Sequence, residues 1–132
     1  MRNIDLSEGI DRASLVDLLC TAFYGCDWAY IETLPSEDKI DELLDENYVR
    51  TRCIEDKWAD RLLHGGHLVI TDLFDENQNR YELTLDRINE GLRRARDRQA
   101  PYDWCDFIEE NEDYFTCNNL IQVCLFGEIV YG

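Results

Sequence analysis

The chain has 132 residues, of which 45% are hydrophobic and 11% aromatic, enough apolar material for one domain with a hydrophobic core. Its 29 Asp and Glu against 13 Lys and Arg give a formal net charge of −16. This charge argues against direct binding of nucleic acid or of an anionic membrane, because both present phosphates that the surface would repel. The expected partners are basic protein surfaces or divalent cations.

The start of the chain lacks the apolar run of a secretory signal, and no stretch approaches the roughly 18 apolar residues of a membrane-spanning helix. We therefore expect a cytoplasmic protein with no membrane partner. In that compartment the six cysteines (Cys20, Cys26, Cys53, Cys105, Cys117 and Cys124) are expected to be reduced thiols. No repeat or Pro/Gly-rich linker divides the chain, so residues 1–132 are predicted to form one domain.

The first half of the chain predicts three helices and a short strand. Leucine and alanine side chains recur at helical spacing over residues 11–24. Residues 28–33 are β-branched and aromatic enough for a short strand. A serine N-cap favours an acidic helix over residues 36–46, and apolar residues on one line predict a further helix over residues 53–64, stopped by Gly65 and its neighbouring glycine.

The second half begins with two β-prone runs around a polar turn, which predict a β-hairpin at residues 67–84. Thr84 is then a suitable N-cap for a helix running to residue 99, and residues 103–110 predict a short fifth helix. Thr116 is predicted to cap a sixth helix, and the apolar tail 128–131 to dock as an edge strand or against the helices. We expect an α+β domain of about five to six helices around a small antiparallel sheet with this central hairpin.

Charge is distributed asymmetrically along the chain. Acidic residues dominate residues 27–46, five arginines fall within residues 87–98, and no Lys or Arg follows Arg98. Two acidic faces are the candidate partner-binding residues: Asp38, Asp41, Glu42, Asp45 and Glu46 in the first, and Asp106, Glu109, Glu110, Glu112 and Asp113 in the second.

Two interpretations of these faces stay open. Either the carboxylates are solvated and pair with the arginines of the same molecule, or they merge into one negative surface that copies the phosphates of a nucleic acid. Such a surface would bind the basic groove of a nucleic-acid-binding protein or nuclease. Four aromatic residues lie among these carboxylates: Trp104, Phe107, Tyr114 and Phe115. They are suited either to anchor an interface or to fill the core.

Chemical motifs are weak by comparison. His64 and His67 suggest the beginning of a zinc site, but no second ligand pair has the required spacing, so the pair fits a helix stop before a strand better. Cys53 opens a predicted helix, where a thiol is acidified, yet no nucleophile motif surrounds it. No phosphate-binding glycine loop is present. We expect a protein that is not an enzyme and has no cofactor; a zinc-dependent module using His64 and His67 and a homodimeric structural protein are the alternatives.

Two parts of the sequence resemble small acidic proteins of bacterial mobile elements and phages. They are residues 58–72 together with 81–86, and residues 113–117 together with 126–132. The resemblance covers about half of the chain, and its motifs are structural: a helix stop, a hairpin and a docked tail. It implies no catalytic residue. It does imply an anti-defence role, since acidic inhibitors of restriction and CRISPR enzymes occur on the same elements and many act by charge mimicry.

Overall fold

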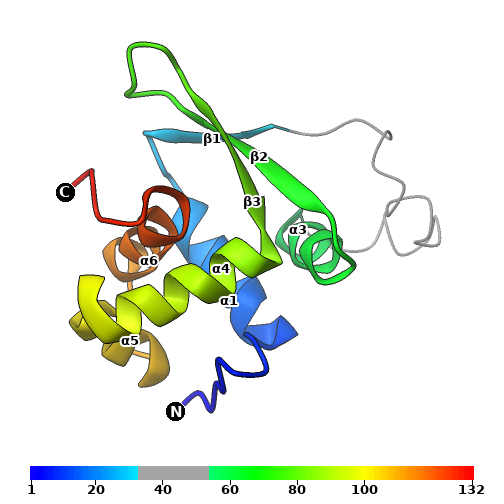
Figure 1. The fold of residues 1–132 in the computed structure, drawn as a ribbon, viewed down its shortest axis with the longest axis vertical. Coiled ribbons are helices and arrows are strands. Elements are labelled where there is room, and N and C mark those ends of the chain that lie inside the picture. The colour runs from blue at the N-terminus through cyan, green and yellow to red at the C-terminus, as the bar shows by residue number, and fades with distance from the viewer. Residues whose placement is uncertain (33–53) are drawn as a thin grey trace.

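The computed structural model describes residues 1–32 and 54–132 and shows an α+β fold (Figure 1). In these two stretches, five α-helices accompany one three-stranded antiparallel sheet, so the predicted fold class is confirmed. The elements in chain order are α1 (Arg12–Phe23), β1 (Ala29–Glu32), α3 (Ile54–Leu63), β2 (His67–Asp72), β3 (Arg80–Thr84), α4 (Leu85–Arg94), the π-helical η2 (Ala95–Gln99), α5 (Pro101–Ile108) and α6 (Tyr114–Phe126).

Part of the sequence prediction lies outside the described residues. This applies to the acidic helix expected over residues 36–46 and to Cys53. It also applies to the whole first acidic face, which consists of Asp38, Asp41, Glu42, Asp45 and Glu46. The structural account of the acidic surface therefore concerns the second face and its surroundings.

The predicted hairpin forms the centre of the sheet. β2 pairs antiparallel with β1 on one side and β3 on the other, so that Ile70 lies opposite both Ile31 and Tyr81. Side chains along β2 alternate between the two faces, and Leu68 and Ile70 are fully buried on one of them. The helices cover this apolar side of the sheet, while the hairpin turn projects beyond them (Figure 1).

Helix α6 is the centre of the helical layer. It packs against α1, α4 and α5, and nine of its residues are buried. This enclosure explains why its sequence is apolar on all sides rather than along one stripe. Two of its buried polar side chains, Asn118 and Gln122, are hydrogen-bonded to distant segments: Asn118 accepts from the indole of Trp28 (2.8 Å) and Gln122 accepts from the backbone of the tail after α6.

Helices α4 and α6 touch along their backbones. A Cβ built on Gly91 of α4 would lie 2.5 Å from the Cα of Cys124 on α6. No side chain larger than hydrogen fits there without moving one of the helices. The position of Gly91 therefore sets how close the two helices come.

Two helix starts illustrate the capping rules. The side chain of Thr84 accepts from a backbone N–H of α4, as predicted. The cap predicted for Thr116 is wrong, because Asp113 accepts the N–H of Thr116 (2.9 Å) and α6 begins at Tyr114. An aspartate three positions earlier provides a charged acceptor at the positive end of the helix, and this outcompetes the hydroxyl.

The middle helices also differ in their bounds. The helix predicted to run from Thr84 to residue 99 is α-helical only to Arg94 and continues as the π-helical η2. Helix α5 starts at Pro101, slightly before the predicted residue 103, because a proline at the first helical position loses no hydrogen bond. It ends at Ile108, and Glu110 then takes a left-handed conformation (φ 61°) that turns the chain toward α6.

The tail after α6 docks without forming a strand. The carbonyl oxygen of the Gln122 side chain accepts the backbone N–H groups of Val130 (2.8 Å) and Tyr131 (2.7 Å), and its amide donates to the carbonyl of Tyr131 (2.9 Å). One buried glutamine therefore replaces the pairing that an edge strand would supply. Of the two predicted modes, docking against the helices is the one observed.

Within the described residues, no helix combines the length and apolar character needed to cross a bilayer. The five cysteines there are free thiols. Burial raises the pKa of both Cys117 and Cys124 to about 12. These two thiols are therefore protonated at neutral pH and serve as small apolar groups in the core.

Candidate functional site

Carboxylates gather where α5 turns into α6, and we name Asp103, Asp106, Glu109 and Asp113 the α5–α6 acidic corner. Asp103 is the best-defined member. Burial is the largest cause that raises its pKa, a hydrogen bond from Asn119 (3.3 Å) opposes this, and the charges of Asp106 and Asp113 raise it further. Charges that raise the pKa of Asp103 in this way must lie close to it in the fold.

The other members of the corner are accessible to solvent. Hydrogen bonds from the backbone of α6, the one from Thr116 foremost, hold the pKa of Asp113 below its ordinary value. Asp106 and Glu109 are exposed. Within residues 1–32 and 54–132, none of the four corner carboxylates forms an ion pair. As far as the described residues are concerned, the corner therefore presents unpaired negative charge to solvent.

Two predicted partner-binding residues, Glu110 and Glu112, differ from this group because the start of the chain neutralises them. Glu110 pairs with the terminal ammonium of Met1 (2.9 Å), and Glu112 pairs with Arg2 (2.5 Å). The Glu112 side chain is only 10% exposed. It is thus a structural anchor more than a part of the surface, a role that sequence alone does not reveal because Arg2 lies at the other end of the chain.

Asp27 lies close to the start of α6. The phenol of Tyr114, which follows Asp113, has a raised pKa because it is buried, because it is hydrogen-bonded to Cys26 and because the charge of Asp27 opposes its ionisation. Asp27 opens the acidic stretch of residues 27–46. The first residue of that stretch therefore lies close to Tyr114, the neighbour of Asp113 in the α5–α6 acidic corner.

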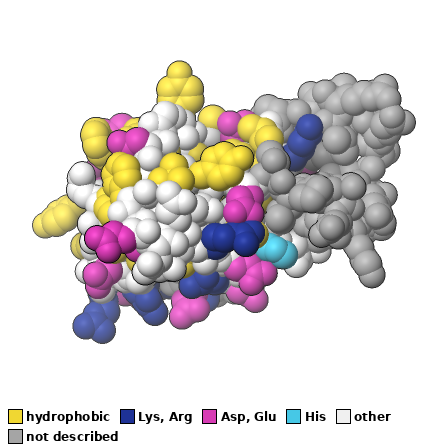
Figure 2. Space-filling view, turned by 90° about the horizontal axis from the view of Figure 1, so that it is seen from above, with side chains coloured by type: hydrophobic (Ala, Val, Ile, Leu, Met, Phe, Trp, Pro, Cys, Tyr) yellow, Lys and Arg dark blue, Asp and Glu magenta, His cyan; other side chains and the backbone are white. Residues whose placement is uncertain are grey.

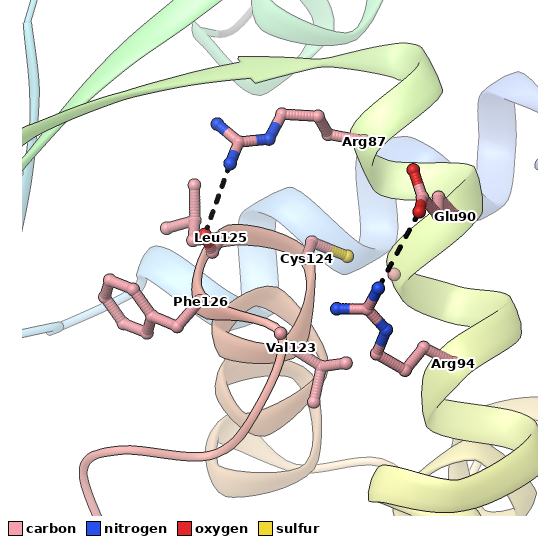
Figure 3. A pocket seen from close by; sticks show the side chains of 9 residues that line it. Arg87, Glu90, Arg94, Val123, Cys124, Leu125 and Phe126 are labelled. Atoms are coloured by element: carbon pink, nitrogen blue, oxygen red, sulfur yellow. Dashed lines mark hydrogen bonds and ion pairs between the residues drawn. The ribbon is translucent and has the colours of Figure 1, made fainter.

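The arginines of residues 87–98 are engaged elsewhere in the molecule. Arg87 and Arg94 reach from α4 toward the end of α6, across a hollow of about 230 Å³ (Figure 3). Arg87 donates to the carbonyl of Leu125 (3.5 Å), and Arg94 forms a long ion pair with Glu90 (3.7 Å). Cations at this place suit the negative end of the α6 dipole. The hollow thus lies between α4 and the C-terminal end of α6.

Arg93 and Arg96 of that segment also have partners close by. Arg93 donates to the carbonyl of Leu6 (2.8 Å), and Arg96 pairs with Asp97 (2.7 Å). In the part of the chain that the structure describes, no arginine of residues 87–98 forms an ion pair with the α5–α6 acidic corner. The intramolecular neutralisation considered from the sequence is not found there.

The two histidines do not converge on one point. The Nδ1 atom of His64 lies 2.8 Å from the carbonyl of Asp60, and that of His67 lies 3.2 Å from a carboxylate oxygen of Glu82 on the neighbouring strand. Among the described residues, no group of three or more His, Cys, Asp or Glu side chains is arranged to hold a metal ion. His64 and His67 thus act as a helix end and a cross-strand contact in this structure.

The aromatic residues of the acidic segment divide into two classes. Trp104 and Phe107 are buried in the core, whereas Phe115 is 65% exposed. Exposed apolar side chains that the sequence analysis did not single out follow β2 and α6, chiefly Phe74 and Val130. Figure 2 shows apolar side chains gathered on the face seen from above, with carboxylates among them. Consecutive apolar residues within a predicted turn or tail are the signal that would have indicated them.

In comparisons with known proteins, no family model, curated protein or solved structure matches the chain.

Proposed function

We propose that this chain is a non-enzymatic protein-binding domain that offers the α5–α6 acidic corner to the Lys/Arg-rich surface of a nucleic-acid-binding protein, in the place of the nucleic acid. The observation that carries the proposal is the gathering of Asp103, Asp106 and Asp113 at the turn from α5 to α6, close enough for the last two to raise the pKa of Asp103, with no ion-pair partner in the described residues. Repelling carboxylates raise the free energy of the isolated protein, and a basic partner relieves that repulsion.

The net charge of −16 acts in the same direction over a longer range. A field of one sign steers an oppositely charged surface into contact and speeds association, especially at low ionic strength. The same field disfavours direct binding of nucleic acid. A protein that itself binds nucleic acid is the partner class with the complementary charge.

The finer form of the proposal is an inhibitor of a host defence nuclease of the restriction or CRISPR type. It is supported by the resemblance of residues 58–72, 81–86, 113–117 and 126–132 to acidic proteins of mobile elements and phages. In this form the domain competes with DNA or RNA for the nuclease groove. Its effect on the nuclease should therefore be overcome by added nucleic acid.

The experiment is a competition assay with a panel of restriction and CRISPR nucleases and fluorescent duplex DNA. Wild type is compared with Asp106→Asn/Glu109→Gln and with a control pair, Glu8→Gln/Asp86→Asn, which removes the same charge elsewhere on the exposed surface. The corner variant should lose about tenfold in affinity, the control much less, and added salt should weaken wild-type binding steeply. If the protein displaces DNA from none of the nucleases at low salt, or if both variants lose affinity equally, the proposal is wrong.

The two alternatives have direct tests of their own. A zinc-dependent module using His64 and His67 requires stoichiometric zinc in protein purified without a histidine tag. A homodimer that joins the arginine segment of one copy to an acidic face of another requires a mass that falls when the salt concentration rises. Elemental analysis and light scattering at two salt concentrations measure these quantities.

A further inference from the structure

Two hollows meet at one aromatic ridge on the surface. A hollow of about 480 Å³ lies between the hairpin turn and the tail, and one of about 300 Å³ lies between the tail and the start of α6. Phe74 and Tyr131 line both of them. We name these two residues, with the exposed Val130 beside them, the Phe74–Tyr131 ridge.

Tyr131 is held rigidly within this ridge. Its ring packs on Trp28 (centroids 5.3 Å apart) and meets Phe74 edge to face (5.5 Å). Its hydroxyl donates to Asp72 (2.6 Å), and Gln122 fixes its backbone. A ring held by contacts on several sides has little conformational entropy left to lose when a partner binds.

Phe74 is held in an exposed position by the same carboxylate. Asp72, 3% exposed, accepts the backbone N–H of Phe74 (3.1 Å) as well as the hydroxyl of Tyr131, and the N–H of Leu73 donates to the carbonyl of Trp28 (2.7 Å). These bonds fix the first residues after β2 although Phe74 itself is 55% exposed. The hairpin turn thus presents an ordered aromatic ring to solvent.

Charge around the ridge has a single sign. Asp75 and Glu76 line the larger hollow and Asp27 lines the smaller one, while among the described residues no lysine or arginine lines either hollow. Phe115, 65% exposed, extends the apolar area on the side of α6. Adjacent exposed apolar side chains rimmed by charge are typical of surfaces that bind proteins.

We propose that the Phe74–Tyr131 ridge is a docking surface for a segment of a partner protein that carries apolar side chains next to Lys or Arg. The apolar side chains enter the two hollows, and the cations meet Asp27, Asp75 and Glu76. A second copy of this chain fits poorly, because pairing the ridge with itself would bring these carboxylates together. The inference rests on the proposed function in that both require a basic partner, and it adds an apolar anchor to that partner.

The test uses two synthetic peptides of equal length and charge. One consists of Lys and Ala, and in the other some Ala residues are replaced by Leu and Phe. Binding to the full chain is measured by calorimetry at low ionic strength and mapped by backbone amide NMR shifts. Because burial of an apolar side chain is favourable, the Leu/Phe peptide should bind at least about tenfold more tightly than the Lys/Ala peptide, with shifts at Phe74 and Tyr131.

The variant Phe74→Ser should abolish the difference between the two peptides and leave binding of the Lys/Ala peptide unchanged. Tyr102→Ser, which removes an aromatic ring that is 86% exposed and lines neither hollow, is the matched control and should preserve the difference. Far-ultraviolet circular dichroism checks that both variants remain folded.

Each outcome separates the two proposals. If the Lys/Ala peptide binds but Leu and Phe add nothing, or if Phe74→Ser has no effect, the ridge is not a docking surface while the acidic corner still stands. If neither peptide binds, the acidic-surface proposal fails as well. If light scattering detects a dimer that Phe74→Ser dissociates, the ridge binds a second copy and the present inference is wrong.

Discussion

Arg2 and Glu112 form an ion pair of 2.5 Å in which the exposed fractions of the two side chains are only 9% and 10%. The same guanidinium donates to the carbonyl of Phe107 (2.6 Å) and stacks over its ring, with the carbon of the guanidinium 4.3 Å from the ring centroid. This contact ties the start of the chain to the turn between α5 and α6. Because Glu112 is paired with Arg2 in this way, it differs from the carboxylates of the neighbouring α5–α6 acidic corner.

Removing Arg2 should destabilise the fold. The variant Arg2→Met leaves the carboxylate of Glu112 buried without a cation, which costs about 3 kcal/mol in the free energy of unfolding. Adding Glu112→Gln should recover much of this loss, because no buried charge then remains. Asp17→Asn is the control: Asp17 also pairs with Arg2 (3.0 Å), but its side chain is 56% exposed, so the loss should stay below about 1 kcal/mol. Urea denaturation of the wild type and the three variants measures these differences. A double variant that is as unstable as Arg2→Met would contradict the argument.

Close packing of α4 on α6 makes Gly91 the most sensitive glycine in the described residues. Gly91→Ala gains helix propensity but forces a methyl group to within 2.5 Å of Cys124, so a net loss of about 1–3 kcal/mol is expected. The neighbouring exposed position provides the control, because Glu90→Ala should change the free energy of unfolding by less than about 0.5 kcal/mol. Thermal unfolding distinguishes them, and equal melting temperatures would show that the helices can separate freely.

Replacing Gln122 should destabilise the tail without destabilising the sheet. In Gln122→Met the backbone N–H groups of Val130 and Tyr131 lose their acceptor, at a cost of about 1–3 kcal/mol. Amide hydrogen exchange should accelerate at these two residues and stay unchanged in the centre of the sheet, for example at Ile70. Protection of the tail amides in the variant would mean that another group holds the tail.

These cases also explain how far the sequence could be interpreted. The periodicity of α1, of the hairpin and of α4 is local information, and local patterns predicted those elements correctly. The pairing of Arg2 with Glu112 and the fixing of Tyr131 by Asp72 join positions remote along the chain, and no pattern within a short window encodes them. Thr116 failed as a cap because two acceptors competed within the same turn, and the choice between them depended on which one the chain geometry presented.

The acidic corner has a pH signature at Asp103. Its pKa is raised in the folded state by burial and by the charges of Asp106 and Asp113, so the folded protein holds this proton more tightly than the unfolded chain does. Stability therefore falls as the pH rises from the ordinary aspartate pKa, about 3.9, through the raised value, and the loss persists at neutral pH. Asp103→Asn, which can still accept from Asn119, should raise the free energy of unfolding at pH 7 by about 0.5 kcal/mol or less, since solvent screens the partly exposed group.

The gain from Asp103→Asn should vanish at pH 3, where the wild-type carboxyl is protonated, and should shrink in high salt. The matched control is Asp97→Asn, which removes a charge that Arg96 compensates (2.7 Å), so it should bring no such gain. Urea denaturation at the two pH values supplies the measurement. A gain from Asp103→Asn that is equal at both would show that repulsion within the corner is not its origin.

The pKa of Tyr131 is raised, as that of Asp103 is, but the stability linked to it is lost only at alkaline pH. The hydrogen bond from its hydroxyl to Asp72, then burial and the charge of Asp72, raise its pKa to about 12, against about 10 for a tyrosine in an unfolded chain. Because the raised group keeps its proton, its contribution to stability is complete below pH 10 and is lost as the pH passes 12. The ultraviolet titration of wild type minus that of Tyr131→Phe should therefore show one phenol with a midpoint near about 12. A midpoint near 10 would mean that the hydroxyl does not donate to Asp72, and the ridge would then lack the bond that orders its central ring.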